Sequence, residues 1–322
     1  MKRQHQILAG VLIIQVIISV LVFWPESAAM ETGASVFPDL SAEDIVSLRI
    51  TDDTGNEIAL QRSGDTWVLP EAGDYPARET AVTQVLEKLI ALQTGSLVTR
   101  SDASHKQLQV AGDEFVRRIL FETAEGESYT LYLGSAPRYT ATHFRVAGEA
   151  NTYLTTELSA WELNVQPNQW VETTYTQIDT ETVTTVVLEN AQGTFTFVRD
   201  EAGENWTLAD LAAGEQVATS STNAVVRNAT SMSLSAPLGT ESQPEYGMDT
   251  PNAIVSIETT EGTQTVAVGA EDPASGDYVV KYSESPYYVQ VASFTVSPMV
   301  NNAREDFLAE PQPTPTPEVT EP

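Results

Sequence analysis

The sequence predicts an α+β fold: an N-terminal transmembrane helix, then two tandem homologous units, each an antiparallel or mixed sheet with a packed helix. Three observations predict it. An uncharged apolar run lies near the N-terminus, a series of alternating segments with glycine turns occurs twice, and each copy holds one stretch of helical periodicity. Hydrophobic residues make up 41% of the 322 residues, which is enough for packed cores.

The apolar run is the expected membrane anchor. Residues 7–24 read ILAGVLIIQVIISVLVFW and contain no charged side chain. A helix needs about 20 apolar residues, and at least roughly 17, to span a bilayer. A tryptophan at its end is typical of the aromatic belt at a membrane surface. We expect the anchor to meet the lipid bilayer through the side chains of Ile7, Leu12, Ile17, Leu21 and Trp24.

The charges beside this run predict its direction. Lys2 and Arg3 precede it, and the first charged residue after it is Glu26. Because basic residues stay in the cytoplasm, residues 1–6 are expected to be a cytoplasmic stub and the body to be extracytoplasmic, on a single-pass cell-membrane protein. Cleavage at the small residues 27–29, as after a signal peptide, is an alternative that the sequence leaves open.

Composition excludes several classes of function. The net charge at pH 7 is −29, from 45 acidic and 16 basic side chains. Such a surface repels phosphate backbones, so we expect no nucleic-acid partner. The acids are scattered, which favours a solvated surface over a binding face for cations or basic partners; adaptation to salt is an open alternative. The chain has no cysteine, which excludes disulfides, thiol catalysis and thiolate metal sites.

The middle of the chain contains an apparent duplication. Residues 45–69 and 183–208 each hold two alternating runs joined at a glycine turn, then a polar turn and a Trp-x-Leu motif around Trp67 or Trp206. Two further pairs of segments match in the same order, residues 124–137 with 260–273 and residues 143–156 with 278–291. Alternation around glycine turns is typical of antiparallel hairpins with one buried face.

One helix is expected between the hairpin groups of each copy. Residues 82–92 carry apolar side chains at helical spacing, with Pro76 expected in the first turn and Gly95 after the last. Residues 218–232 carry a weaker version of the same pattern. Short helices that close the two units are expected at residues 157–163 and 294–301.

These elements predict the domain boundaries. Residues 25–42 form a spacer, residues 43–176 the first repeat unit and residues 177–308 the second. The tail, residues 309–322, has five prolines and is expected to be disordered. Whether the two units share one sheet stays open.

The order of these motifs resembles a known family. A Tyr-Gly-Met-Asp-Thr-Pro element at residues 246–251 has a degenerate counterpart, Leu-Gln-Val-Ala-Gly-Asp, at residues 108–113. With the exported hairpins and the Trp-x-Leu motifs, it makes residues 43–308 similar to the domain-of-unknown-function family 4340. The repeat-signature residues, to which we assign a structural role, are Trp67, Trp206, Gly134, Gly269, Tyr246, Gly247 and Pro251.

The resemblance implies little chemistry. It implies a bacterial protein with one N-terminal anchor and an association with auxiliary parts of gliding-type ABC export systems. It carries over no activity, catalytic residue or cofactor.

No residue set nominates a catalytic site. His105 and His143 have no second histidine at i+3 or i+4, and the sequence has no G-x-S-x-G or S-x-x-K motif. A structural or solvated role is favoured for both histidines. Carboxylates are so numerous that close pairs arise by chance, so they nominate no glycosidase pair.

Metal and sugar sites are also disfavoured. Residues 52–57 and 200–205 resemble loose calcium loops without the EF-hand spacing, and hairpin turns need the same residue types. Tryptophans at 67, 161, 170 and 206 offer stacking surfaces for sugars, but the recurrence of Trp67 and Trp206 favours core packing. We expect no catalytic, cofactor-binding or metal-binding residue, and no cofactor.

The leading hypothesis is a non-enzymatic, membrane-tethered extracytoplasmic interaction module with a protein partner in an ABC-transport or cell-envelope assembly. The alternative is capture of a glycan or small solute in a cleft between the two units. A third and weaker hypothesis is a hydrolase with an acidic active site.

Overall fold

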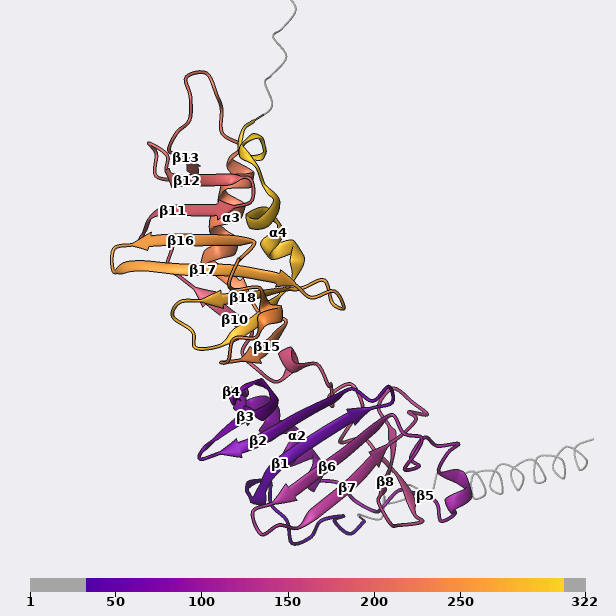
Figure 1. The fold of residues 1–322 in the computed structure, drawn as a ribbon. Coiled ribbons are helices and arrows are strands. Elements are labelled where there is room, and N and C mark those ends of the chain that lie inside the picture. Colours follow the sequence, from indigo (N-terminus) through magenta and orange to yellow (C-terminus); the bar gives the residue numbers. More distant parts are fainter. Residues whose placement is uncertain (1–32, 310–322) are drawn as a thin grey trace, which may run out of the picture. The chain divides into compact units, whose positions relative to one another are not determined.

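The computed structural model describes residues 33–309 (Figure 1). Its strands form a nine-stranded sheet, an eight-stranded sheet and a small two-stranded sheet. By its internal contacts the chain divides into two compact units, residues 1–45 with 85–163 and residues 46–84 with 164–322. Strands dominate and three α-helices accompany them in the described residues, so the α+β class is confirmed.

The first sheet has the strand order β4-β3-β2-β1-β6-β7-β8-β9-β5. Its strands are β1 (Ile45–Asp52), β2 (Glu57–Ser63), β3 (Thr66–Leu69), β4 (Tyr75–Pro76), β5 (Leu97–Thr99), β6 (Arg117–Thr123), β7 (Ser128–Leu133), β8 (Thr142–Val146) and β9 (Thr152–Thr155). The hairpins β1–β2, β6–β7 and β8–β9 are antiparallel, as their alternation predicts.

The second sheet has the order β13-β12-β11-β16-β17-β18-β19-β15. Its strands are β11 (Val183–Asn190), β12 (Gly193–Arg199), β13 (Trp206–Leu208), β15 (Ala236–Gly239), β16 (Ala253–Thr259), β17 (Gly262–Glu271), β18 (Tyr278–Tyr282) and β19 (Tyr288–Val291). The small sheet pairs β10 (Thr174–Gln177) with β14 (Ser231–Ser233).

The two large sheets are separate and share one topology. Without the two-residue strand β4, the first sheet repeats the order of the second strand for strand. The two predicted units therefore do not share one continuous sheet, because each has a large sheet of its own. Descent of both from one duplicated ancestor, and the boundaries at 43–176 and 177–308, stay predictions.

Three α-helices are described: α2 (Glu79–Ile90), α3 (Thr219–Thr230) and α4 (Ser293–Asn301). Helix α2 buries Val82, Val85, Leu86 and Leu89, the apolar face that its spacing predicts. In the second half α3 contacts β13, and α4 contacts β11, β16 and β17, on the sheet face that both helices cover in Figure 1. The 3-10 helices are η1 (Ala42–Asp44), η2 (Pro70–Ala72), η3 (Asp102–Ser104), η4 (Pro167–Gln169), η5 (Pro244–Tyr246) and η6 (Arg304–Phe307).

Two helix predictions are wrong in detail. Pro76 lies in β4 and not in the first turn of α2, which begins at Glu79. Residues 157–163 form turns instead of a closing helix. The carboxylate of Glu162 accepts hydrogen bonds from the backbone N–H and the hydroxyl of Ser159, which closes a single turn in a segment too short to sustain a helix. The other closing helix, expected at residues 294–301, is present as α4.

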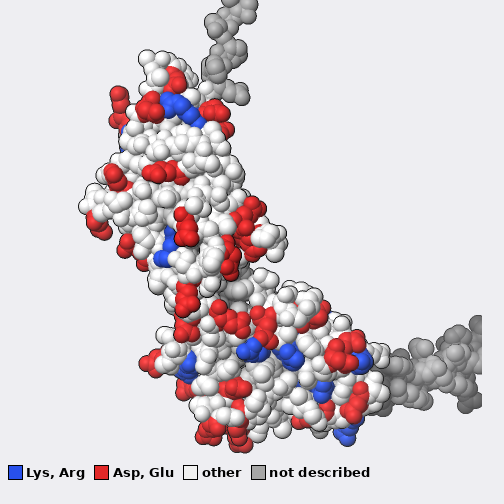
Figure 2. Space-filling model, in the orientation of Figure 1, with Lys and Arg blue, Asp and Glu red and all other residues white. Residues whose placement is uncertain are grey.

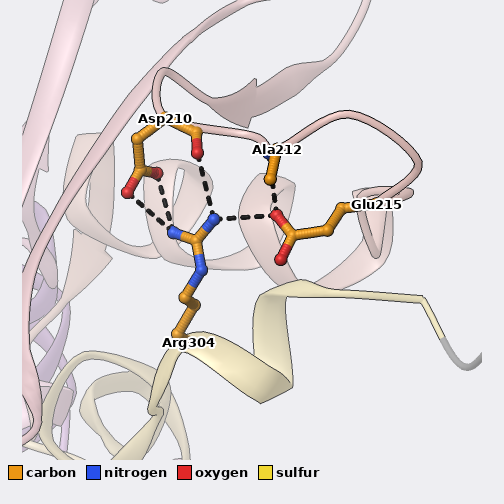
Figure 3. A network of polar contacts seen from close by, with 4 residues as sticks. All are labelled: Asp210, Ala212, Glu215 and Arg304. Carbon is orange, nitrogen blue, oxygen red and sulfur yellow. Dashed lines mark hydrogen bonds and ion pairs between the residues drawn. The ribbon is translucent and has the colours of Figure 1, made fainter.

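In each predicted repeat unit, a backbone bridge joins the segment before the helix to the end of the unit. Ala77, just before α2, forms a bridge with Val171, and Val217, just before α3, forms a bridge with Leu308. In the second half Arg304 of η6 strengthens this closure (Figure 3). Its guanidinium lies 2.8 Å from both carboxylate oxygens of Asp210 and 2.8 Å from Oε2 of Glu215.

Some predicted segments lie outside the described residues. These are the anchor at residues 7–24, residues 25–32 of the spacer and nearly all of the proline-rich tail. Among residues 33–309, no helix is long and apolar enough to cross a membrane.

Candidate functional site

The repeated tryptophans lie in the interior. Trp67 of β3 and Trp206 of β13 are 2% and 4% exposed. The guanidinium of Arg199 lies 4.4 Å from the centre of the Trp206 ring, a distance typical of a cation–π contact. Neither indole is available to stack on a sugar in solvent.

The repeated glycines allow a close backbone approach. A Cβ on Gly134 would lie 2.0 Å from the carbonyl oxygen of Leu108, and one on Gly269 would lie 2.0 Å from that of Tyr246. The residues that follow Leu108 and Tyr246 are Gln109 and Gly247. Both have a positive φ, of 56° and 67° respectively. The degenerate element at residues 108–113 therefore keeps the backbone shape of its counterpart, with a glutamine where glycine is favoured.

The Tyr-Gly-Met-Asp-Thr-Pro element packs against its own sheet. The ring of Tyr246 lies 5.4 Å from that of Tyr288, centre to centre. Gly247 ends η5 in the left-handed conformation, and Pro251 lies two residues before β16. These contacts give the element a structural place and no cavity of its own.

A pair of cations holds the last hairpin of each large sheet. Arg145 of β8 donates hydrogen bonds to the carbonyl oxygens of Val146 and Glu149, each at 3.3 Å. Lys281 of β18 donates to the carbonyl oxygens of Tyr282 and Ser285, the same positions relative to itself. Burial lowers the pKa of both basic groups. Both cations therefore serve the hairpin loops.

The histidines are held by backbone carbonyls. His105 Nε2 lies 2.9 Å from the oxygen of Ala150, and His143 Nδ1 lies 2.8 Å from that of Ser135. Both side chains are largely buried. Their surroundings fit a structural role.

The two calcium-like segments are turns. The carboxylate of Asp52 accepts hydrogen bonds from the backbone N–H groups of Thr54 and Asn56, and that of Asp200 accepts one from Glu204. Burial raises the pKa of Asp52, but the bonds from Asn56 and Thr54 outweigh it and hold this pKa below its usual value. Within the described part of the chain, no three His, Cys, Asp or Glu side chains gather as a metal site would require.

A pocket of about 560 Å³ lies in the first half of the chain, and we name it the β5 pocket. Three segments line it: the end of α2 and the turn before β5, the loop between β7 and β8, and the end of β9. The lining residues are Ala91, Gln93, Gly95, Ser96, Arg138, Thr140, Ala141, Leu154, Thr155, Thr156 and Glu157. Its volume falls within the range of about 300–1,000 Å³ that is usual for ligand sites.

The β5 pocket holds several polar side chains and carries one charge of each sign. Arg138 contributes a guanidinium and Glu157 a carboxylate, and Gln93 adds an amide. Among residues 33–309 none of these three groups has a side-chain hydrogen bond or ion pair. For Arg138 this is unexpected, because acidic side chains outnumber basic ones by 45 to 16.

Exposed apolar side chains lie beside this pocket. Leu97 and Val98 of β5 are 38% and 44% exposed, and Tyr139, between the lining residues Arg138 and Thr140, is 99% exposed. β5 is the last strand of its sheet, and no other described strand pairs with its outer side. Figure 2 shows acidic side chains spread over the visible face, which fits a solvated surface.

Sequence reasoning missed this site. The three segments that form the β5 pocket are about 40 and 15 residues apart along the chain, so no local motif marks them. Leu97-Val98-Thr99 is too short to show alternation. The run of small residues from Thr94 to Ser96 before it was the one available turn signal.

A second, smaller pocket of about 180 Å³ lies beside α3. Its lining includes Arg199, Trp206, Asn223 and Arg227. The lining residues Glu204 and Arg227 are exposed, so this space is an open depression of the surface.

Comparison with known proteins identifies the family. No curated protein and no solved structure matches the chain. The family model described as a domain of unknown function, DUF4340, matches residues 67–243. The match begins at Trp67, crosses from the first half into the second and ends just before the element at residues 246–251. Since it covers more than half of the 322 residues, the chain belongs to the DUF4340 family.

Proposed function

We propose that this chain is a membrane-tethered extracytoplasmic module that binds another protein and catalyses no reaction. Its place is the cell membrane, with the body outside the cytoplasm, as part of an ABC-transport or cell-envelope assembly. The observation that carries the proposal is the open outer edge of the apolar strand β5 and its position next to the start of the described chain.

Strand β5 has the features of a docking edge. Leu97 and Val98 expose apolar side chains, and the strand contains neither proline nor a charged residue. Proteins usually protect the edges of sheets with such residues, because an open edge pairs with other strands. An edge without them can accept an extended segment of a partner through main-chain hydrogen bonds.

The start of the described chain lies close to this edge. The described chain begins at Gly33, and Ala34 accepts a hydrogen bond from the N–H of Thr94, three residues before β5. Eight residues lie between Trp24, the end of the predicted anchor, and Gly33, which makes nine Cα-to-Cα steps. At about 3.3–3.6 Å per residue, they reach roughly 30 Å at most. The proposed anchor would therefore keep β5 near the membrane.

The remaining groups support binding over catalysis. The polar side chains that could have served catalysis instead form hydrogen bonds with backbone groups of their own predicted repeat unit. They are His105, His143, Arg145 and Lys281. They stabilise loops and hairpins. The acidic surface favours a partner whose contacting face is basic or neutral.

Site-specific photo-crosslinking in the bacterial host tests the docking edge. A photoreactive amino acid at position 97 or 98 of the full chain should capture one discrete membrane or envelope protein. Val98→Lys should abolish the crosslink from position 97, because a lysine protects the edge. The control position is Phe294, which is 81% exposed on α4. Equal crosslinking from 294, or none from 97 and 98, would contradict the proposal.

The tether has its own test. Alkaline extraction should leave the chain in the membrane fraction, and protease added from outside should digest the body. Release of the intact chain into the soluble fraction would contradict the anchor.

A further inference from the structure

We propose that the β5 pocket binds a neutral, polyhydroxylated ligand, a short glycan, with Tyr139 as the surface on which a sugar ring stacks. This inference concerns a small ligand and does not depend on the docking edge of β5.

The lining of the pocket suits a ligand that has both polar groups and apolar faces. Seven of its eleven residues carry polar side chains, and hydroxyls come from Ser96, Thr140, Thr155 and Thr156. Like most ligand pockets, it also offers apolar surface. A wholly apolar ligand would leave several of the polar groups without hydrogen bonds, which disfavours it.

The charges select a neutral ligand. Arg138 and Glu157 together give the lining no net charge, so it offers neither an anion nor a cation a matched site. Guanidinium, carboxylate and amide groups are planar and can form two parallel hydrogen bonds. Neighbouring hydroxyls of a sugar are suited to such pairs. Arg138, Glu157 and Gln93 thus match the chemistry of a glycan.

The aromatic side chain supplies the third element. Tyr139 is 99% exposed, so its ring contributes almost nothing to the packing of the fold. It lies in the chain between Arg138 and Thr140, both of which line the pocket. The apolar C–H face of a sugar stacks on an aromatic ring. Tyr139 does not itself line the pocket, so its exposed ring would have to turn toward a sugar held beside Arg138 and Thr140.

Titration of the full chain in nanodiscs tests the inference, because many detergents are themselves glycosides. The probes are maltose, cellobiose and N,N′-diacetylchitobiose, with free glutamine as a zwitterion. At least one disaccharide should bind with a Kd of about 1 mM or lower. Tyr139→Ala and Arg138→Gln should each weaken it roughly 3- to 10-fold, with unfolding temperatures unchanged.

The matched control is Trp161→Ala. Trp161 is also exposed, at 76%, but neither it nor either of its chain neighbours lines the pocket, so its loss should leave the affinity unchanged. Three results would overturn the inference: no disaccharide binds, glutamine binds and the sugars do not, or all three variants bind like the native chain. These three results concern ligand binding only, so they can be told apart from a failure of crosslinking at Leu97, which concerns the docking edge.

Discussion

Gly134 lies against the carbonyl oxygen of Leu108, so close that a Cβ at this position would be 2.0 Å from that oxygen. Gly269 makes the same approach to Tyr246 in the other large sheet. The obstacle in both is backbone, which cannot rotate away as a long side chain can. Each glycine therefore fixes a loop against the end of its strand.

Alanine at either glycine should be severely destabilising. We expect Gly134→Ala and Gly269→Ala each to lower the free energy of unfolding by about 3 kcal/mol or more, since the backbone must move. The control is Gly126→Ala, where φ is 87° but nothing lies within 4 Å of the added atom. It should cost only about 1–2 kcal/mol. Equal losses in urea-induced unfolding would contradict the steric explanation.

Thr152 offers a stabilising substitution. It is fully buried, and its hydroxyl has no hydrogen-bond partner within residues 33–309. Thr152→Val should raise the free energy of unfolding by about 1 kcal/mol, because a buried unpaired hydroxyl is removed. Thr222→Val is the matched control, since the buried hydroxyl of Thr222 donates to the carbonyl of Trp206 at 2.6 Å. The control should be destabilised by about 1–2 kcal/mol; stabilisation of both variants would count against this account.

Tyr175 should make stability fall at alkaline pH. Its hydroxyl donates to the carbonyl of Tyr287 and accepts from the N–H of Tyr282, and burial raises its pKa to about 12. Because the folded pKa exceeds the ordinary value of 10.0, the stabilisation is complete below pH 10 and is lost as pH rises towards 12.

Tyr175→Phe tests this directly. At neutral pH it should cost about 1–3 kcal/mol, because two partly buried backbone groups lose their partner. Its unfolding free energy should also fall less steeply above pH 10. Tyr139→Phe, at an exposed ring, is the control and should change neither quantity.

The contacts of Arg304 should matter at acid pH. A hydrogen bond from Arg304 lowers the pKa of Asp210, and bonds from the N–H of Ala212 and from Arg304 lower that of Glu215. Their stabilisation is present above the ordinary pKa values of 3.8 and 4.5 and is lost as pH falls through the lower folded values. Arg304→Gln should flatten this acid dependence in thermal unfolding, whereas Arg100→Gln should not. If Arg304→Gln kept the acid dependence of the native chain, the contacts of Arg304 would not be its cause.

Secondary structure could be predicted from the sequence where a hydrophobic pattern extends over many residues. Strands such as β1 and β11 alternate over eight residues, and α2 shows its apolar face plainly, so hairpins and helices could be predicted. Residues 157–163 form turns, although Ser159 and Glu162 make the hydrogen bonds of a helix start, because the segment is too short to sustain a helix. Pro76 was misplaced because a proline is equally suited to a strand edge and to a first helical turn.

The candidate site could not be predicted in this way. The β5 pocket is assembled from three segments that meet only in the folded chain. The exposure of Tyr139 and the lack of a partner for Arg138 are properties of its surface, which no local pattern encodes. Sequence reasoning could exclude catalytic motifs, but it could not locate a cavity.

The junction at the start of the described chain has a mechanical consequence. Ala34 and Val36 are bound to Thr94 and Leu92 by backbone hydrogen bonds of 3.0 and 2.9 Å. If residues 7–24 hold the chain in a membrane, any pull on the body is transmitted through this short ladder. If these two hydrogen bonds broke, a few residues at the start of the body would extend before any strand of the sheets came under tension. The two bonds would therefore protect the sheets from mechanical unfolding.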